Sequence, residues 1–480
     1  MNVSRLDFIR GVLASLGLGS VGVGRMFAVP SGWRPAKRAN LVFGVVSDTH
    51  LRTRRGSSGR PGRNWPHKYF AAALGYFREQ NVDAVVHCGD FAHRGQVEEM
   101  RFHAGVWNRI FPGNRAPDGH EVVKMFVTGN HDTDGAGYGS FVKDNYPCPE
   151  VRAKHVLQTN MAANWERIWG ERYEPVWHKE VKGYHFFGRN YRVAKEELAS
   201  CLREHAAELS ASGKLGRPFF YMQHSRPLWD VRKVLRHLCR GCMPMAFFGH
   251  NHWSASNWNV ISLYKGGLPC IQVPSCEPRG CGGLVGDAWI STAKIERTDK
   301  TGRGRQGYVV RVYDDMLVIG RREFGAGGSL GADWVMPLGG AATRHPLSKD
   351  ELKKVVGEPQ FRDGAKVEVR RCVDAEERSL KVSIPLADGN PRSRVYAYEV
   401  EISGAAGVLR KAVYVAGCNL GMGHEPDGGV TTLMVKEAEL PSGKLLVVSV
   451  TPLTSLGTRG RPKSVAVSAR TACADAAGSV

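Results

Sequence analysis

The sequence predicts an α/β domain followed by a separate all-β domain. From residue 41 onwards, short runs rich in β-branched residues alternate with segments of helical periodicity. This alternation is typical of a mostly parallel sheet with helices on both faces. Beyond about residue 346, short strands of alternating apolar and polar residues are separated by Gly, Pro, Asn and Asp turns. That pattern favours a β-sandwich of immunoglobulin or fibronectin type, and 480 residues are enough for two or three domains.

The elements of the first domain follow one another along residues 41–324. A helix is expected at 67–80, because Phe70, Leu74 and Phe77 recur at helical spacing. Other helices are expected at 97–110 and 194–212, and a closing hairpin at 308–324 turns at Asp314 and Asp315. Strands are expected at 41–48, 83–90, 122–130, 183–190, 217–225, 244–252, 257–264 and 268–274.

The second domain is expected at residues 346–480, after a Gly-rich linker at 325–345. No Cys…Trp…Cys signature marks a true immunoglobulin domain. Its strands are expected at 366–369, 380–384, 395–402, 411–415, 431–435, 445–450 and 464–468.

Composition excludes some classes of protein. Hydrophobic content of 42% and charged content of 23% exclude wholesale disorder. No apolar run reaches the roughly 18–20 residues of a membrane span, so no integral span is expected. The net charge of +20 favours acidic partners such as phosphate esters, nucleic acid or anionic surfaces, although a solvated basic surface is the plainer interpretation.

Residues 1–28 are predicted to be a signal peptide. Arg5 and Arg10 precede an uncharged stretch at 11–24, which is long enough for a signal core and too short to span a bilayer. The segment around Arg5 resembles a degenerate bacterial twin-arginine signal, with Leu6 where the second arginine would stand. We therefore expect an exported protein, periplasmic or extracellular. The alternative is a buried first helix in a cytoplasmic protein.

The eleven cysteines leave two interpretations open. An exported protein can pair some of them as disulfides, and a structural zinc site is the second interpretation, although the spacing does not match a compact pair of CxxC motifs. Cys88 lies inside an apolar run and is expected to be a core residue. The suggestive set is Cys239, Cys242, Cys270, Cys276 and Cys281.

Polar residues of one chemical kind follow the ends of five predicted strands. Ligands bind at the carboxyl ends of the strands in an open α/β sheet. Each fragment alone is weak, because a histidine or aspartate at a strand end is usually a satisfied polar residue or a helix cap. Together they offer oxygen and nitrogen donors without sulfur, which suits transition metals rather than calcium. The fragments are Asp48-Thr49-His50, Gly89-Asp90, Gly129-Asn130-His131-Asp132, His224 and Gly249-His250-Asn251-His252.

In this order, D-x-H, GD, GNHD, H and GH-x-H resemble the calcineurin-like metallophosphoesterase superfamily, motif for motif. The resemblance covers about residues 41–324 and implies a four-layer α/β sandwich with a centre of two metal ions, Zn, Mn or Fe. It implies that Asp48, His50 and His252 hold the first metal. Asn130, His224 and His250 would hold the second, and Asp90 would bridge both.

The resemblance also implies a reaction. A hydroxide held between two cations attacks a phosphate ester, because two cations strongly lower the pKa of a bridging water. His131 would face the leaving-group oxygen as a general acid or charge stabiliser. Asp132 is the predicted partner that orients the His131 ring.

Differences from the family pattern help to choose among its subfamilies. Purple acid phosphatases have glycine where His50 stands and a metal-binding tyrosine where His93 stands, so a tyrosinate-bound iron centre is not expected. The pattern looks more like the branch with cyclic-nucleotide phosphodiesterases and bacterial phosphatases. Arg52 and Arg54 follow His50 and are candidates to bind substrate phosphate, or they belong to a solvated loop. Trp165 and Trp169 favour helix packing over stacking on a substrate.

The expected function is hydrolysis of phosphate mono- or diesters, with a phosphorylated small molecule or a phosphodiester as substrate. A nuclease or cyclic-nucleotide phosphodiesterase is the first alternative. Nucleic acid is compatible with the charge but not favoured, because no basic stripe interleaved with aromatic residues is present. The second alternative is a non-catalytic protein that binds surfaces through its C-terminal β-sandwich, and the complete set of ligands argues against it.

Overall fold

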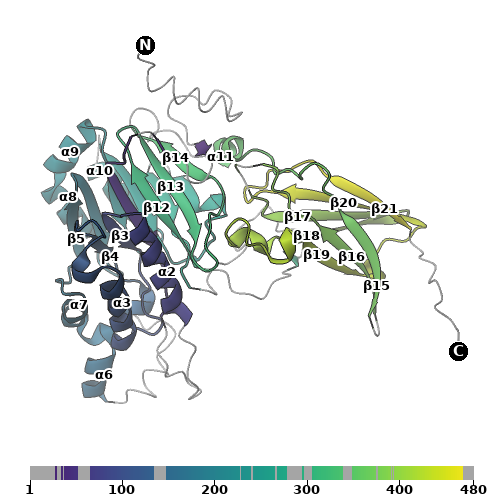
Figure 1. The fold of residues 1–480 in the computed structure, drawn as a ribbon. Helices are drawn as coiled ribbons and strands as arrows, with labels where there is room; N and C mark the ends of the chain where they lie inside the picture. The colour runs from purple at the N-terminus through teal and green to yellow at the C-terminus, as the bar shows by residue number, and fades with distance from the viewer. Residues whose placement is uncertain are drawn as a thin grey trace, which may run out of the picture. The chain divides into compact units, whose positions relative to one another are not determined.

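The computed structural model describes most of the chain, and the elements are shown in Figure 1. Two compact units divide the chain, one from residues 1–282 and 302–355 and the other from residues 283–301 and 356–480. The described residues are 27–29, 34–35, 37–51, 65–133, 148–227, 229–238, 242–264, 268–277, 295–296, 305–338, 349–374, 377–390, 392 and 394–468.

Two sheets form the centre of the first unit. In the seven-stranded sheet, of order β1-β14-β13-β12-β2-β3-β4, the strands β2, β3 and β4 run parallel and the others pair antiparallel. Buried β-branched and aromatic residues make these central strands almost continuously apolar. Their bounds are β1 (Phe27–Val29), β2 (Leu41–Val46), β3 (Ala84–His87), β4 (Val123–Phe126), β12 (Gln306–Val312), β13 (Met316–Glu323) and β14 (Asp333–Pro337).

The six-stranded sheet has the order β5-β6-β7-β8-β10-β9. Its strands β6, β7, β8 and β10 run parallel, and the edge strands β5 and β9 pair antiparallel. The Phe43 ring from β2 meets the rings of Phe186, Phe220 and Phe247 at centroid distances of 5.4, 4.8 and 6.0 Å, so the two sheets pack face to face. Their bounds are β5 (Val176–Val181), β6 (Tyr184–Arg189), β7 (Pro218–Met222), β8 (Met243–Phe248), β9 (Ile261–Tyr264) and β10 (Leu268–Gln272).

Helices cover the outer face of each sheet and complete four layers (Figure 1). Phe70, Trp107, Trp165 and Trp169 belong to the core beneath α2, α3 and α7, which confirms that the two tryptophans pack a helix onto the core. Leucines of α8, α9 and α10 form the core against the second sheet. The bounds are α2 (Trp65–Glu79), α3 (Val97–Ile110), α4 (Asn130–Thr133), α6 (Pro149–His155), α7 (Met161–Trp169), α8 (Lys195–Glu204), α9 (Ala206–Lys214), α10 (Trp229–Leu238) and α11 (Lys349–Val356). Short 3-10 helices are η1 (Pro112–Asn114), η2 (Leu157–Asn160) and η3 (Trp258–Val260).

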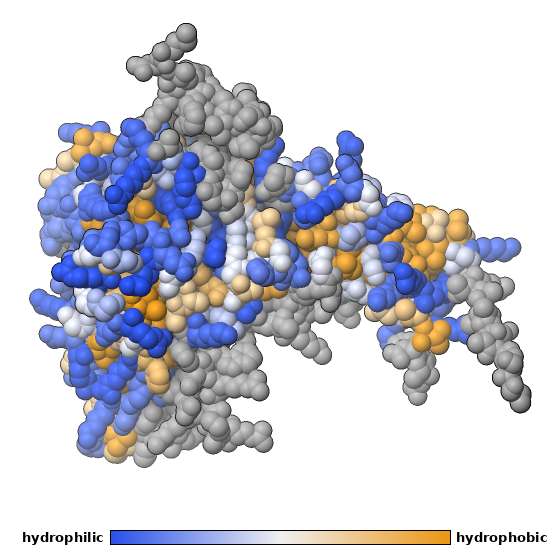
Figure 2. Space-filling model, viewed as in Figure 1, coloured by the Kyte–Doolittle hydropathy of each residue, from blue (hydrophilic) through white to orange (hydrophobic). Residues whose placement is uncertain are grey.

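The C-terminal unit is a sandwich of a three-stranded and a five-stranded sheet, and all seven predicted strands are present. Residues from both sheets, such as Val382, Val400 and Val448, share one core, which confirms the β-sandwich. Seven of the nine large hydrophobic side chains that the described residues expose lie in this unit, so its surface is the more apolar (Figure 2). The strands are β11 (Ile295–Glu296), β15 (Glu368–Asp374), β16 (Glu377–Ile384), β17 (Ala397–Gly404), β18 (Gly407–Tyr414), β19 (Thr431–Lys436), β20 (Leu445–Leu453) and β21 (Lys463–Ser468), with 3-10 helices η6 (Ala416–Asn419), η7 (Pro426–Gly429) and η8 (Glu437–Glu439).

Three local predictions differ from the structure. The predicted helix at 194–212 is interrupted at His205, whose backbone is not helical, and forms α8 and α9. Within the predicted linker, β14 pairs with β13 and extends the seven-stranded sheet. The edge strand β5 was not predicted, because its polar residues His178, Lys179 and Glu180 follow one another and interrupt the alternation.

The predictions for the N-terminal segment, the cysteines and a membrane span can also be compared with the structure. Residues 1–26 lie outside the described part, so the signal peptide stays a prediction. Strand β1 begins at Phe27, so cleavage after Ala28 would remove two of its three residues. The described cysteines are free thiols, Cys88, Cys242, Cys270 and Cys276 among them, while Cys239 and Cys281 lie outside the described residues. Among the described helices none is long and apolar enough to cross a membrane.

Candidate metal centre

Parallel strands bring the predicted ligands to one edge of the first unit. Asp48 and His50 follow β2, Asp90 follows β3, and Asn130 follows β4. In the second sheet, His224 follows β7, and His250 and His252 follow β8. Because the strands within each sheet are parallel and the sheets are stacked, these carboxyl ends meet at one place. All seven predicted ligands are brought together there.

One set of ligand atoms consists of Asp48, His50 and His252. Each offers a ligand atom within 4.8 Å of the other two. His252 Nε2 lies 3.0 Å from Asp48 Oδ1 and 3.2 Å from His50 Nε2. Two imidazole nitrogens that face each other and a carboxylate at this distance are the arrangement that a shared cation requires.

The second set consists of Asn130, His224 and His250. The Asn130 Oδ1 atom lies 2.9 Å from His224 Nε2 and 3.0 Å from His250 Nδ1. The two imidazole nitrogens are 3.2 Å apart. These spacings match the edges of a coordination polyhedron whose ligands lie about 2.0–2.2 Å from one ion.

Asp90 lies between the two sets. Its Oδ2 atom is 3.1 Å from His224 Nε2 and 3.6 Å from His50 Nε2. Its other oxygen, Oδ1, accepts the backbone N–H of His131 at 2.8 Å. The geometry therefore places a buried carboxylate where a bridging ligand would have to be.

Strained backbone accompanies the ligands. The described residues include ten non-glycine residues with positive φ, and five of them are predicted ligands. Such conformations cost of order 1–3 kcal/mol each and persist where the surrounding structure holds them, which is typical of functional sites. The five ligands are Asp48 (φ 51°), His50 (φ 42°), Asp90 (φ 58°), His250 (φ 74°) and His252 (φ 55°).

The motif glycines allow the loops to approach the ligands. A Cβ atom on Gly129 would lie 2.1 Å from Asp90 Oδ1. A Cβ atom on Gly249 would lie 2.0 Å from Ser47 Oγ and 2.5 Å from Asp48 Oδ2. Glycine is required at both positions because backbone passes directly against a ligand carboxylate.

Hydrogen bonds behind the ligands set their orientation. The His224 Nδ1–H group donates to the Cys88 carbonyl at 2.8 Å, which leaves Nε2 free to bind a metal. The backbone N–H of Gly249 donates to the His224 carbonyl at 2.8 Å and joins β7 to the His250 loop. Ser275 Oγ donates to the Asp48 carbonyl at 2.9 Å.

The electrostatics of the site call for a cation. Burial would raise the pKa of Asp48, but His252 and His50 outweigh it and hold that pKa well below its usual range. Burial would lower the pKa of His224, but the Asp90 and Asp48 carboxylates raise it to about 9. A protonated His224 thus supplies the positive charge that two buried carboxylates need. A divalent metal ion would supply positive charge at the same place and can replace the proton.

The donor set fits two transition-metal ions. Two carboxylates, one amide oxygen and four imidazoles form two groups that share Asp90, and no thiolate takes part. Hard and borderline donors of this kind suit zinc, manganese or iron. Asp48, His50 and His252 would hold one ion and Asn130, His224 and His250 the other.

His131 lies beside the metal ligands. His50, His93 and His131 each offer a ring nitrogen within 4.8 Å of the others, and the His50 and His131 rings meet edge to face at 4.5 Å. The His131 Nδ1–H group donates to the His93 carbonyl at 2.8 Å. Burial, and next the charge of His50, lower the pKa of His131 against the opposing effect of Asp90.

Asp132 differs from its predicted role. Its carboxylate accepts the backbone N–H groups of Asp90 (2.9 Å), Phe91 (3.3 Å), Ala92 (2.8 Å) and Gly129 (2.8 Å). The His131 ring nitrogen Nδ1 instead donates to a backbone carbonyl, that of His93. Asp132 thus holds the loop that carries the bridging ligand, and the orienting role passes to the His93 carbonyl.

Some residues near the site were missed or cannot be placed. The role of Ser275 was not predicted, since nothing in the sequence shows that the segment after β10 packs against Asp48. Thr49 Oγ1 joins the buried His87 and His103 side chains at 3.0 and 3.2 Å, a network with no sequence signature. Arg52 and Arg54 lie outside the described residues, so their substrate role stays a prediction.

The chain was compared with family models, solved structures and curated proteins. The model of the family "Calcineurin-like phosphoesterase" matches residues 41–254. A dimetal phosphatase structure from Danio rerio has 11% identity and a TM-score of 0.35, with coverage of 63% of this chain and 100% of that one. A Staphylococcus aureus structure assigned as a 5′-nucleotidase, in complex with alpha-ketoglutarate, has 12% identity and a TM-score of 0.27, with coverage of 65% of this chain and 57% of that one. A search of curated proteins gave no match.

The family match spans all seven residues that converge at the two ligand sets, from Asp48 to His252. Members of this family are metal-dependent phosphoesterases with a dinuclear centre. Residues 41–254 of this chain thus match the model of the calcineurin-like phosphoesterase family.

Proposed function

We propose that the chain hydrolyses phosphate mono- or diesters at this centre, with His131 as the proton donor to the leaving oxygen. The observation that carries the proposal is the pair of ligand sets that share Asp90, since one carboxylate lies 3.1 Å from His224 and 3.6 Å from His50. When bound, the metal ions would supply Lewis-acid activation of water and of the phosphoryl oxygens.

The chain's own residues give the centre its charge and shape. Only two of the seven ligands are carboxylates, because Asn130 stands where a third anion would otherwise be. With two divalent cations bound, the centre keeps a net positive charge and attracts a phosphate. The positive-φ loops fix the ligands before substrate arrives, so little reorganisation is needed during the reaction.

His131 is positioned to handle a proton next to this charge. The His93 carbonyl accepts its Nδ1–H and fixes the ring, so we assign the proton transfer to Nε2. A bound phosphate dianion raises the pKa of a neighbouring imidazole, which favours protonation once substrate is present. That proton can then pass to the leaving oxygen.

The activity itself is tested with two model substrates. Metal content and the hydrolysis of p-nitrophenyl phosphate and bis-p-nitrophenyl phosphate are measured before and after removal of metal by a chelator. We expect metal-dependent turnover of at least one ester, and their ratio assigns the monoester or diester preference. Asp90→Asn should abolish turnover and weaken both metal sites. A metal-loaded protein that hydrolyses neither ester would contradict the proposal.

The role of His131 is tested by leaving-group chemistry. An alkyl alcohol leaves poorly without a proton, whereas p-nitrophenolate needs none, so His131→Ala should damage alkyl ester hydrolysis far more. We expect both metals to remain bound and turnover of alkyl esters to fall by roughly 10²–10⁴-fold. His120→Ala is the matched control, because His120 contacts Asp118 and the Val82 carbonyl instead of the ligands. Equal losses for the two ester types would show that His131 positions substrate or stabilises charge.

A further inference from the structure

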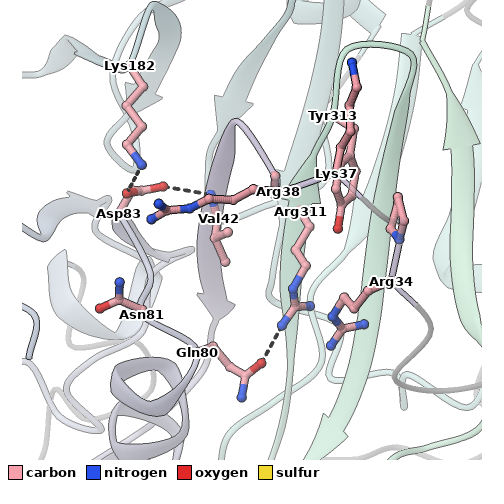
Figure 3. Close-up of a pocket in the computed structure, with 12 residues that line it drawn as sticks. Arg34, Lys37, Arg38, Val42, Gln80, Asn81, Asp83, Lys182, Arg311 and Tyr313 are labelled. Atoms are coloured by element: carbon pink, nitrogen blue, oxygen red, sulfur yellow. Dashed lines mark hydrogen bonds and ion pairs between the residues drawn. The ribbon is translucent and has the colours of Figure 1, made fainter. Parts of the chain in front are cut away.

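A cavity lies at the opposite ends of the strands from the metal ligands. Its volume is about 440 Å³, and Figure 3 shows the residues that line it. Val42 lies at the start of β2, Asp83 directly precedes β3, and Tyr313 directly follows the antiparallel strand β12. Since β2 has six residues at about 3.3 Å each, roughly 20 Å of strand separates this cavity from the loops that carry the ligands.

The cavity is lined by five cationic side chains and one carboxylate. Lys182 pairs with that carboxylate, Asp83, at 2.6 Å. Arg34 and Lys37 pair with carboxylates outside the lining, Asp333 at 3.4 Å and Asp314 at 3.8 Å. The other two cations are Arg38 and Arg311, and neither forms an ion pair with another described residue.

Arg311 occupies an unusual place for an arginine. It is the last residue but one of the buried strand β12, and its side chain is only 6% exposed. Its hydrogen-bond partner is the neutral amide oxygen of Gln80, as the dashed line in Figure 3 shows. Burial, and next the charge of Arg34, lower its pKa. A buried cation without an anionic partner is costly, and an anion in the cavity would offset that cost.

We propose that this cavity binds the phosphate group of a small molecule between Arg38 and Arg311. Two guanidinium groups from different segments suit a tetrahedral anion, which presents oxygen atoms in several directions, better than a planar carboxylate. The volume lies in the range of about 300–1,000 Å³ for small-molecule sites, so the ligand carries more than a bare phosphate. The site shares no residue with the metal centre and is independent of the proposed reaction.

Calorimetry with inorganic phosphate tests the proposal on the full chain with its metals bound, at about 150 mM salt. The wild type should show two classes of site, one at the metal centre and one at the cavity. Arg38→Gln and Arg311→Gln should each weaken the second class at least 10-fold and leave the first unchanged. Arg78→Gln is the matched control, because Arg78 is an exposed arginine of α2 that does not line the cavity.

Two variants are used so that the binding experiment still decides the question if one of them fails to fold. Arg38 is exposed, so its replacement should be tolerated even if that of the buried Arg311 is not. Binding of succinate as tight as that of phosphate would overturn the assignment to phosphate. A single class of site in the wild type, or equal binding by all three variants, would overturn the cavity as an anion site.

Discussion

Asp132 shows how one side chain connects distant loops. Its carboxylate accepts N–H groups from Asp90 and Ala92 on one loop and from Gly129 on another. Asp132→Ala should therefore release the loop with the bridging ligand and weaken metal binding, by about 10–100-fold if it behaves as other outer-shell substitutions do. Titration with zinc measures this loss, and the preference for nitrophenyl over alkyl esters should stay as in the wild type. Intact metal binding with a selective loss on alkyl esters would instead return Asp132 to the His131 ring.

The position of the Asp90 carboxylate also depends on the absence of a side chain at Gly129. Gly129→Ala places a methyl group 2.1 Å from Asp90 Oδ1, so either the bridging carboxylate or the loop has to move. We expect loss of metal binding and of turnover in this variant. Gly105→Ala is the control, because that helical glycine of α3 has open space around it, and it should stabilise the protein by about 0.5–1 kcal/mol. Metal content and urea unfolding of the two variants check the contrast.

At the scale of elements, the N-terminus of α3 contains a buried titratable group. Glu99 accepts the backbone N–H groups of Arg94 at 2.9 Å and Gln96 at 3.2 Å. Burial raises its pKa from 4.5 to about 7, although these two donors oppose the rise. The folded state therefore holds the Glu99 proton more tightly than the unfolded chain does. Its contribution to stability is full below about pH 4.5 and is lost as the pH rises through about 7.

Glu99→Gln removes this ionisation and keeps an acceptor for the capping hydrogen bonds. The stability of the variant relative to the wild type should increase between pH 5 and pH 8. Urea unfolding at the two pH values measures it, with Glu79→Gln at the end of α2 as the control for the loss of one negative charge. A difference that does not change with pH would show that Glu99 is ionised in the folded protein throughout this range.

The elements also show where local patterns stop being informative. β2, β3 and β4 are buried on both faces, so their residues are mostly apolar, with Lys124 of β4 as an exception, and their ends are clear. β14 is five residues long and follows a Gly-rich stretch, and only the free edge of β13 makes it a strand. The helical pattern through residues 194–212 continues across His205, but the chain changes direction there.

At the scale of the whole molecule, the two units have separate cores, and every proposed ligand belongs to the first. A chain that ends at residue 355 should therefore keep both metals and hydrolyse p-nitrophenyl phosphate at a rate close to that of the full chain. Metal analysis and initial rates check this, and circular dichroism confirms that the shortened chain is folded. Loss of turnover in a folded, metal-loaded fragment would assign the C-terminal unit a part in the reaction.

The sequence by itself determined the ligand set and the order of the strands that carry it. Each candidate ligand lies within four residues of the end of a strand, so its position depends on a local pattern together with the general rule for parallel sheets. The partners of Asp132 and His131 were decided only by the tertiary structure. Asp90 and Ala92 are about forty residues from Asp132, and which of its neighbours offers a free N–H depends on how two loops meet. The cavity with Arg38 and Arg311 has the same origin, since packing alone leaves the buried Arg311 without an anionic partner.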